Sequence, residues 1–205
     1  MITVDNLTVT ARTRLFTDFS YNFVDGTLYL ITAENGSGKT TLLRTIVNFV
    51  RPDVGEVHIN GARYSAQKQQ VFFWESIDWF NLNLSGQDYL EFVQHQWQST
   101  VAIAPVIEYW GMGEYIKVPV KKYSLGMKQR LIVAMYEVSG AQNLLMDEIS
   151  NGLDKDARGL LYTKLRQLAD DGKCVLITSH YRDEIVSYVD QQLAIENQRV
   201  QEVQR

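Results

Sequence analysis

Three short apolar runs, each followed by polar residues, dominate the hydrophobic pattern of the chain. They lie at residues 29–32, 143–146 and 174–179. A nearly continuous apolar run of this length is typical of a strand that is buried on both faces of a parallel sheet. Open α/β sheets bind ligands at the carboxyl ends of such strands. The pattern therefore predicts an α/β core with a ligand site at one sheet edge.

The flanking segments predict additional strands. Strands at residues 2–9, 27–32 and 55–59 are expected to form an antiparallel edge beside the core. A final hairpin is expected around Asn197. Internal repeats and low-complexity linkers are absent from the sequence, so we expect one domain with lobes.

Helical periodicity is concentrated in the middle of the chain. Runs at residues 86–98 and 101–110 predict a helical lobe. An apolar helix is expected at residues 131–135, and a short one at residues 183–189.

Composition narrows the class of protein. The 205 residues are 45% hydrophobic and 21% charged, which is ordinary for a globular chain. Cys174 is the only cysteine, which suits a reducing cytoplasm, and no run approaches the roughly 20 apolar residues that span a bilayer. The net charge of −4 gives no general reason to bind nucleic acid. We therefore expect a cytoplasmic protein that meets a membrane only through a partner.

Residues 33–41 read Ala-Glu-Asn-Gly-Ser-Gly-Lys-Thr-Thr and connect the first apolar run to a helix. In such a loop the backbone N–H groups and the helix N-terminus bind phosphate oxygens. Lys39 would reach the β- and γ-phosphates, and Thr40 would offer its hydroxyl to Mg²⁺. The expected nucleotide-binding residues are Asn35, Gly36, Ser37, Gly38, Lys39, Thr40 and Thr41. Ala33 stands where the usual pattern has glycine; it costs little at negative φ, but about 1–2 kcal/mol if positive φ is required.

A second candidate anion site lies at residues 123–130, Tyr-Ser-Leu-Gly-Met-Lys-Gln-Arg, at the start of a helix. Ser124 and Gly126 would face the anion, because a helix N-terminus carries partial positive charge. Nearby cations add to this charge: Lys117, Lys121, Lys122, Lys128 and Arg130. The alternative is that these cations form a solvated surface.

Acidic and imidazole side chains follow the other two apolar runs. Asp147 would hold Mg²⁺ or one of its waters, and Glu148 would polarise an attacking water. His180 follows the third run, where an imidazole can hydrogen-bond a γ-phosphate.

Taken in order, these segments resemble the ATP-binding subunit of ATP-binding cassette (ABC) transporters over essentially the whole chain. Residues 33–41 look like the Walker A loop, and residues 123–127 resemble the L-S-G-G-Q signature. Residues 144–148 look like Walker B with its catalytic glutamate, residues 150–154 like the D-loop, and His180 like the switch histidine.

The resemblance implies a fold, an activity and partners. The fold would be a P-loop NTPase core at about residues 1–74 and 131–205, with an antiparallel β subdomain and a helical subdomain at about 75–130. The protein would be an ATPase that requires ATP and Mg²⁺, with Glu148, His180 and Lys39 as its catalytic residues. Its partners would be transmembrane permease subunits and a second cassette, identical or different. Two cassettes would enclose ATP head to tail, with Ser124 and Gly126 of one chain facing the nucleotide of the other and Asp154 in the interface.

Three departures from the family pattern bear on this expectation. Leu125 replaces the first glycine of the signature and Met127 its glutamine, a variant that resembles bacterial multidrug and bacteriocin-type exporters. Glu75 stands where the Q-loop usually has glutamine, so it is expected either to approach Mg²⁺ or to face solvent. The usual aromatic contact for adenine is missing, which leaves Phe16, Arg12 or Arg14 as candidates.

Two other readings remain open. One is a catalytically slow, nucleotide-sensing cassette, suggested by the substitutions at Ala33, Glu75 and Leu125. The other is a soluble ABC ATPase that acts on ribosomes or DNA; the single cassette and the lack of coiled-coil heptads argue against it. The signature variant favours export over import.

Overall fold

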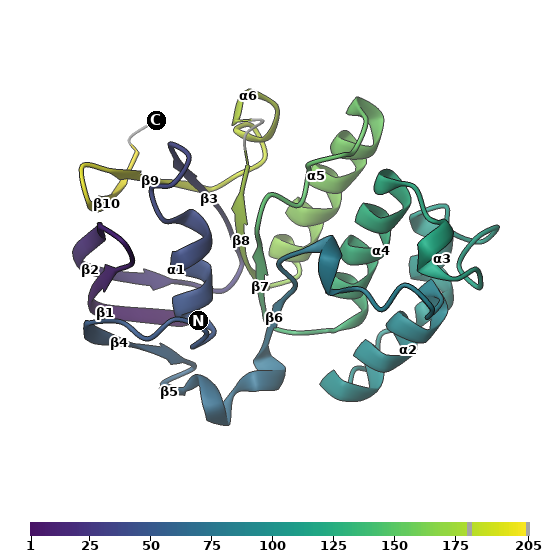
Figure 1. Ribbon diagram of the computed structural model, residues 1–205, viewed down its shortest axis with the longest axis horizontal. Coiled ribbons are helices and arrows are strands. Elements are labelled where there is room, and N and C mark those ends of the chain that lie inside the picture. Colours follow the sequence, from purple (N-terminus) through teal and green to yellow (C-terminus); the bar gives the residue numbers. More distant parts are fainter. Residues whose placement is uncertain (180–181, 204–205) are drawn as a thin grey trace.

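The computed structural model describes residues 1–179 and 182–203, and these form two β-sheets with helices around them (Figure 1). The larger sheet has six strands, and all of its neighbouring pairs except β10–β9 are parallel. In spatial order they are β10 (Arg199–Glu202), β9 (Gln191–Glu196), β3 (Thr27–Ala33), β8 (Cys174–Thr178), β7 (Asn143–Met146) and β6 (Val71–Phe73). The three apolar runs thus form adjacent central strands, as predicted.

The smaller sheet is antiparallel and has the order β2-β1-β4-β5. Its strands are β1 (Ile2–Thr10), β2 (Arg14–Phe23), β4 (Val54–Ile59) and β5 (Ala62–Arg63). The predicted place of residues 27–32 in this edge is wrong: they belong to β3, at the centre of the parallel sheet, and β2 pairs with β1 instead. The reason is burial, because β3 is apolar on both faces whereas β2 alternates buried and exposed positions.

Six helices occur in the described part of the chain, with short 3₁₀ turns between them. The helices are α1 (Lys39–Ile46), α2 (Gly86–Trp97), α3 (Ile103–Tyr109), α4 (Leu125–Val138), α5 (Lys155–Asp170) and α6 (Arg182–Ile185). The 3₁₀ turns are at Tyr64–Ala66, Lys68–Gln70, Ile77–Trp79 and Val120–Lys122. Helices α2 and α3 confirm the two predicted helical runs, α4 starts earlier than predicted, and α6 is shorter. None of these described helices is long and apolar enough to span a membrane.

The central strands separate two hydrophobic clusters because their side chains alternate between the faces of the sheet. On β3, Leu28 and Leu30 pack in one cluster, and Tyr29 and Ile31 pack in the other. The first cluster joins the sheet to α2, α3, α4 and α5, and the second joins it to α1 and the antiparallel strands. Figure 1 shows the result: α1 lies on the side of β1, β2 and β4, and α2 to α5 lie on the opposite side.

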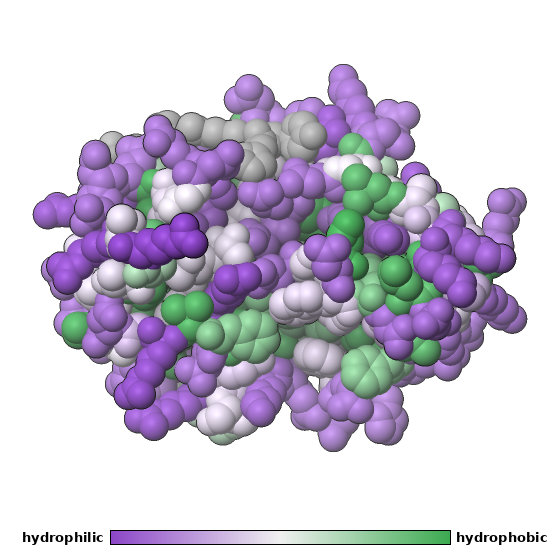
Figure 2. All heavy atoms as spheres, viewed as in Figure 1, coloured by the Kyte–Doolittle hydropathy of each residue, from purple (hydrophilic) through white to green (hydrophobic). Residues whose placement is uncertain are grey.

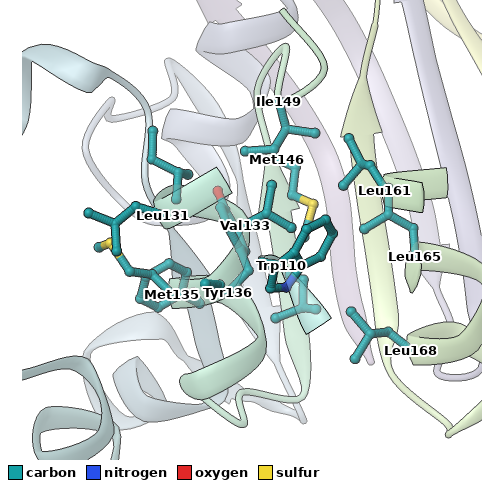
Figure 3. Packing of buried hydrophobic residues seen from close by; sticks show 14 of the residues in the cluster. Trp110, Leu131, Val133, Met135, Tyr136, Met146, Ile149, Leu161, Leu165 and Leu168 are labelled. Carbon is teal, nitrogen blue, oxygen red and sulfur yellow. The ribbon is translucent and has the colours of Figure 1, made fainter. Parts of the chain in front are cut away.

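The largest cluster fixes α4 and α5 against the sheet. Figure 3 shows Leu131, Val133, Met135 and Tyr136 of α4 on one side of Met146, with leucines of α5 on the other. All of these labelled α4 side chains are buried. This packing holds the start of α4 and the end of β7 in fixed positions, and both carry candidate site residues.

Candidate functional site

The loop between β3 and α1 has the backbone shape that a phosphate-binding loop needs. Gly36 and Gly38 have φ angles of 82° and 107°, in the left-handed region that side chains disfavour. Gly38 is also the N-cap residue of α1, and a Cβ placed on it would lie 3.2 Å from the Cβ of Leu15. Asn35 and Ser37 complete the turn. The loop therefore presents backbone, rather than side chains, at the helix N-terminus.

Ala33 causes no backbone strain at the start of this loop. It is the last residue of β3 and is not among the residues with positive φ. The sequence left open whether Ala33 has a negative or a positive φ, and the structure shows that its φ is not positive. Alanine therefore substitutes for glycine here without the penalty of a left-handed conformation.

Lys39 opens α1 and is 6% exposed. Its Nζ donates to the carbonyl oxygens of Ala33, at 3.0 Å, and Glu34, at 3.5 Å. Both of these partners are neutral, so the ammonium charge can still attract an anion. The lysine lies where the sequence predicted it, at the loop, with its charge turned back over the backbone.

Thr40 joins the phosphate loop to the carboxyl end of β7. Its hydroxyl donates to Oδ2 of Asp147 at 2.5 Å. The other carboxylate oxygen of Asp147 accepts a hydrogen bond of 2.6 Å from the hydroxyl of Thr178, at the end of β8. Three segments far apart in the sequence thus meet at one oxygen-rich point, and hard oxygen donors of this kind suit Mg²⁺.

Glu148 follows Asp147 in an unusual backbone conformation. Its φ is 49°, which is uncommon for a residue with a side chain. Its N–H donates to the Thr178 hydroxyl at 2.8 Å, and its carboxylate accepts from Nδ2 of Asn151 at 2.8 Å. The backbone turn and both contacts fix the direction in which the carboxylate leaves the sheet edge.

The signature segment and the D-loop segment form a second, separate hollow of about 230 Å³. Ser124 is the N-cap of α4 and accepts from the Met127 N–H at 3.2 Å, and Asp154 is the N-cap of α5 and accepts from the Ala157 N–H at 2.8 Å. The residues that line the hollow include Ser124, Gly126, Arg130, Gly152 and Asp154. A larger hollow lies beside the phosphate loop and is lined by Arg14 and Leu15 among others; the two hollows share no lining residue.

Leu125, the apolar departure in the signature, packs over the D-loop. A Cβ placed on Gly152 would lie 2.8 Å from a methyl carbon of Leu125. The leucine is therefore accommodated by the glycine opposite, and Gly126 remains at the hollow behind it.

Glu75 does not face solvent in this structure. Its side chain is 13% exposed and forms a two-point ion pair with Arg44 of α1. The Nε of Arg44 donates to one carboxylate oxygen at 2.6 Å, and a second guanidinium nitrogen donates to the other. The expectation that Glu75 faces solvent is therefore wrong.

A hollow of about 730 Å³ lies beside the phosphate loop, and Arg14 and Leu15 line it together with the turn between β9 and β10. Phe16 is fully buried in the core, so it cannot stack on a base from this hollow. Arg12 is not among the lining residues. Of the three candidates for a base contact, Arg14 is the one that the hollow includes.

His180 lies outside the described residues. Ser179, just before it, is buried, and its hydroxyl is 3.2 Å from that of Ser150. Sequence reasoning missed the roles of Thr178, Asn151 and Arg44. For Thr178 there was a signal, a hydroxyl at the end of the third apolar run, in a strand adjacent to β7; Arg44 and Asn151 carry no comparable signal.

A phosphate loop at the start of a helix, with its threonine bonded to a strand-end aspartate, defines a P-loop nucleotide-binding domain. Comparison with protein families matches residues 16–151 to the ABC transporter family. The chain therefore belongs to the ABC transporter family, as an ATP-binding subunit.

Curated relatives agree with this assignment. An uncharacterized ABC transporter ATP-binding protein of Bacillus subtilis, YybJ, is 32% identical over 98% of this chain and 95% of its own length. The lantibiotic transport ATP-binding protein SrtF of Streptococcus pyogenes is 28% identical, over 93% and 84%. The Nod factor export ATP-binding protein I of Sinorhizobium fredii is also 28% identical, but this chain spans only 55% of its length.

Solved structures confirm the fold. The ATP-binding subunit of an ABC transporter superposes with a TM-score of 0.88 over 98% of this chain and 88% of its own, at 19% identity. An ABC transporter ATP-binding protein from Pyrococcus furiosus reaches 0.81, over 95% and 96%, at 23% identity. The predicted fold class, an ABC-type P-loop core with an antiparallel sheet and additional helices, is thus confirmed.

Proposed function

We propose that this subunit binds and hydrolyses Mg-ATP in a head-to-tail dimer of cassettes and so powers export through separate membrane subunits. The observation that carries the proposal is the bond between Thr40 and Asp147. It joins the phosphate loop to the strand end that also presents Glu148. ABC ATP-binding subunits are ATPases as a family, and this chain has the groups that hydrolysis needs.

Thr40 and Asp147 would hold the metal. Their oxygens are 2.5 Å apart and are of the hard type that Mg²⁺ prefers, so the residues present fit the ion. Bound there with ATP, Mg²⁺ would neutralise charge on the β- and γ-phosphate oxygens. Thr178 would keep the Asp147 carboxylate in position, because it binds the oxygen that Thr40 does not.

Glu148 would orient and polarise the attacking water, and Asn151 would orient Glu148. Lys39 would turn from the loop carbonyls to the β- and γ-phosphates, since the phosphates offer it full negative charge. Backbone N–H groups of residues 35–41 would surround the phosphates. His180 is proposed as a γ-phosphate contact from the sequence pattern alone.

The second hollow would serve the nucleotide of the partner cassette. Ser124, Gly126 and Asp154 line a hollow that shares no lining residue with the one beside the phosphate loop. A two-fold dimer would place this hollow against the phosphate loop of the other chain, and vice versa. ATP would then hold the dimer together until it is hydrolysed. The second cassette can be a copy of this chain or a different one.

The membrane partners would be permease subunits, which place this protein at the inner face of the cell membrane. Residues 75–130 would form the helical subdomain that contacts them. Exposed aromatic side chains are available nearby: the rings of Phe49 and Trp79 lie 6.3 Å apart. Figure 2 shows hydrophobic residues gathered mainly over the half that carries α2 to α4. Export is supported by the signature variant and by relatives named for lantibiotic transport and Nod factor export.

Arg14 would supply the contact to the nucleotide base that an aromatic residue supplies elsewhere. Its planar guanidinium can stack on a purine, and Arg14 lines the hollow beside the phosphate loop. The missing aromatic residue therefore does not leave the base without a surface.

The variant Glu148→Gln tests the proposal. The amide retains the shape of the side chain but cannot accept the proton of the attacking water, so turnover should fall by about 100-fold or more. ATP binding should persist, and light scattering should detect a dimer that forms only with Mg-ATP. The matched control is Glu108→Gln, an exposed glutamate on α3, which should leave turnover unchanged.

Two outcomes would count against the proposal. Equal turnover in Glu148→Gln and the unmodified protein would remove Glu148 from the catalytic role. Failure of the unmodified protein to hydrolyse ATP, alone and with any permease, would favour the slow, nucleotide-sensing cassette.

A further inference from the structure

The ion pair between Arg44 and Glu75 lies one helical turn from the proposed metal position. Thr40 and Arg44 are four residues apart on α1, so both side chains lie on the same face of the helix. The first bonds Asp147 and the second bonds Glu75. One stripe of α1 thus binds two carboxylates from two neighbouring strand ends.

The sheet brings those carboxylates together. Strands β6 and β7 are parallel neighbours, and Phe73 pairs with Leu145. Continued by two residues, this register places Glu75 level with Asp147. The backbone before Glu75 is fixed as well, because the N–H of Trp74 donates to the buried hydroxyl of Tyr136 at 3.0 Å. The backbone thus places Glu75 at the same sheet edge as Asp147, and rotation of its side chain decides which groups its carboxylate meets.

Arg44 binds the carboxylate of Glu75 that would otherwise be available to a metal. Both carboxylate oxygens accept a hydrogen bond from the guanidinium, so the carboxylate is turned toward Arg44. The hydrogen bond to Glu75 raises the pKa of Arg44, and the charges of Glu75 and Asp147 also act to raise it, against the effect of burial. The arginine thus lies in the field of both acids, and a divalent cation at Asp147 would enter the same field.

We propose that Arg44 is a positioning residue that competes with Mg²⁺ for the Glu75 carboxylate. The proposal rests on the proposed function, because it needs Mg-nucleotide at Thr40 and Asp147. While Glu75 is paired with Arg44, its charge is withheld from the metal, and the segment that leads from β6 into α2 is held against α1. Rotation of Glu75 toward the metal breaks its two-point contact with Arg44.

The metal dependence of nucleotide binding tests this competition. The dissociation constant of a fluorescent ATP analogue is measured in EDTA and in Mg²⁺. The value in EDTA divided by the value in Mg²⁺ gives the factor by which the metal strengthens binding. Arg44→Met removes the competitor, so it should raise this ratio by about threefold or more. In a Glu75→Gln background the same substitution should have little effect, because the carboxylate is already absent.

Controls separate competition from simple loss of structure. Arg166→Met removes an arginine that pairs with Asp170 and Asp190 on the far side of the sheet, and it should leave the ratio unchanged. Thermal unfolding in EDTA measures the stability of each variant without metal. Arg44→Lys keeps the charge but loses the two-point contact, so it should raise the ratio by less than Arg44→Met does. If Arg44→Met fails to fold, Arg44→Lys is measured in its place.

A purely structural ion pair predicts a different result. Arg44→Met would then lower the unfolding temperature and leave the ratio unchanged. Alternatively, Arg44→Met would change the ratio by the same factor in the unmodified protein and in the Glu75→Gln background. Either result would contradict the proposed competition between Arg44 and Mg²⁺, and it would not affect the proposal that the unmodified protein binds Mg-ATP. If instead the unmodified protein showed no effect of Mg²⁺ on binding, the proposed function itself would fail.

Discussion

Gly38 is the residue of the phosphate loop at which a side chain is least acceptable. Its φ of 107° is unfavourable for any residue with a Cβ, and that Cβ would press against Leu15. Gly36, by comparison, has open space around it. Gly38 is therefore required both by the backbone conformation and by the packing of β2 on the loop.

Gly38→Ala should lower the free energy of unfolding by about 1–2 kcal/mol, because a left-handed conformation costs that much for an alanine. It should also weaken ATP binding, since the left-handed conformation and the close contact with Leu15 both favour a shift of the loop. Urea unfolding and nucleotide titration measure the two effects. Gly159→Ala in α5 is the control: a Cβ there meets nothing within 4 Å, and a gain of about 0.5–1 kcal/mol is expected. A stable, fully binding Gly38→Ala protein would contradict this account.

At the scale of residues, the sequence predicted the groups that chemistry demands but not the groups that orient them. Lys39, Thr40 and Asp147 stand at fixed spacing in short motifs, and the structure joins Thr40 to Asp147. Thr178 and Arg44 each bond a residue 31 positions away, so no local spacing reveals them. Such partners depend on strand order, which is known only once the sheet is formed.

At the scale of elements, a buried charge network connects three helices. Glu137 of α4 accepts a hydrogen bond of 3.1 Å from Lys164 of α5 and another of 3.1 Å from the indole N–H of Trp110, just after α3. The Lys164 ammonium also lies 3.8 Å from the centre of the Tyr109 ring. The network thus ties the α3 region to the helices that pack on the sheet.

Lys164→Met should destabilise the protein by about 3 kcal/mol, because Glu137 would be left as an uncompensated, largely buried charge. The double variant Lys164→Met/Glu137→Gln should recover part of the loss, since the amide oxygen can still accept from Trp110. Urea unfolding followed by circular dichroism gives the comparison, with the exposed Lys117→Met as control. If the double variant is less stable than Lys164→Met, the buried charge is not the cause.

The strands that the sequence predicted best are those with the simplest pattern. Strands β7 and β8 are buried at every position, and each is apolar except for one residue at one end, Asn143 in β7 and Thr178 in β8. Strand β2 was missed because its aromatic residues alternate with Asp, Ser and Asn, and because β-bulges interrupt its pairing with β1. Residues 27–32 were expected in two places at once, and only the observed pairing with β8 and β9 settles which sheet holds them.

At the scale of the whole molecule, the candidate nucleotide-binding residues line two hollows, and these two hollows share no lining residue within one chain. The order of the motifs was enough to predict the architecture, because that order is specific to the family.

Ser124→Arg should abolish the ATP-dependent dimer and leave ATP binding by the monomer intact. The bulky cation would fill the hollow at the N-terminus of α4, while the phosphate loop is untouched. Light scattering in the Glu148→Gln background measures the dimer, and nucleotide titration measures binding. Ser65→Arg, at an exposed serine in a 3₁₀ turn, is the control and should still dimerise. Equal loss of both properties in Ser124→Arg would refute a role across chains.

Burial of both faces of β7 and β8 has a consequence for the specificity of folding. A strand with one polar face cannot shift by one position without exposing its core residues, but a strand that is apolar on both faces lacks this safeguard. Here the alignment must come from the polar groups at the strand ends. The amide of Asn143 donates to the Gln70 carbonyl at 2.9 Å, and Asp147 is bonded by Thr178 and Thr40. Asp147, proposed to hold the metal, would thus also help the chain choose one alignment among several of similar hydrophobicity.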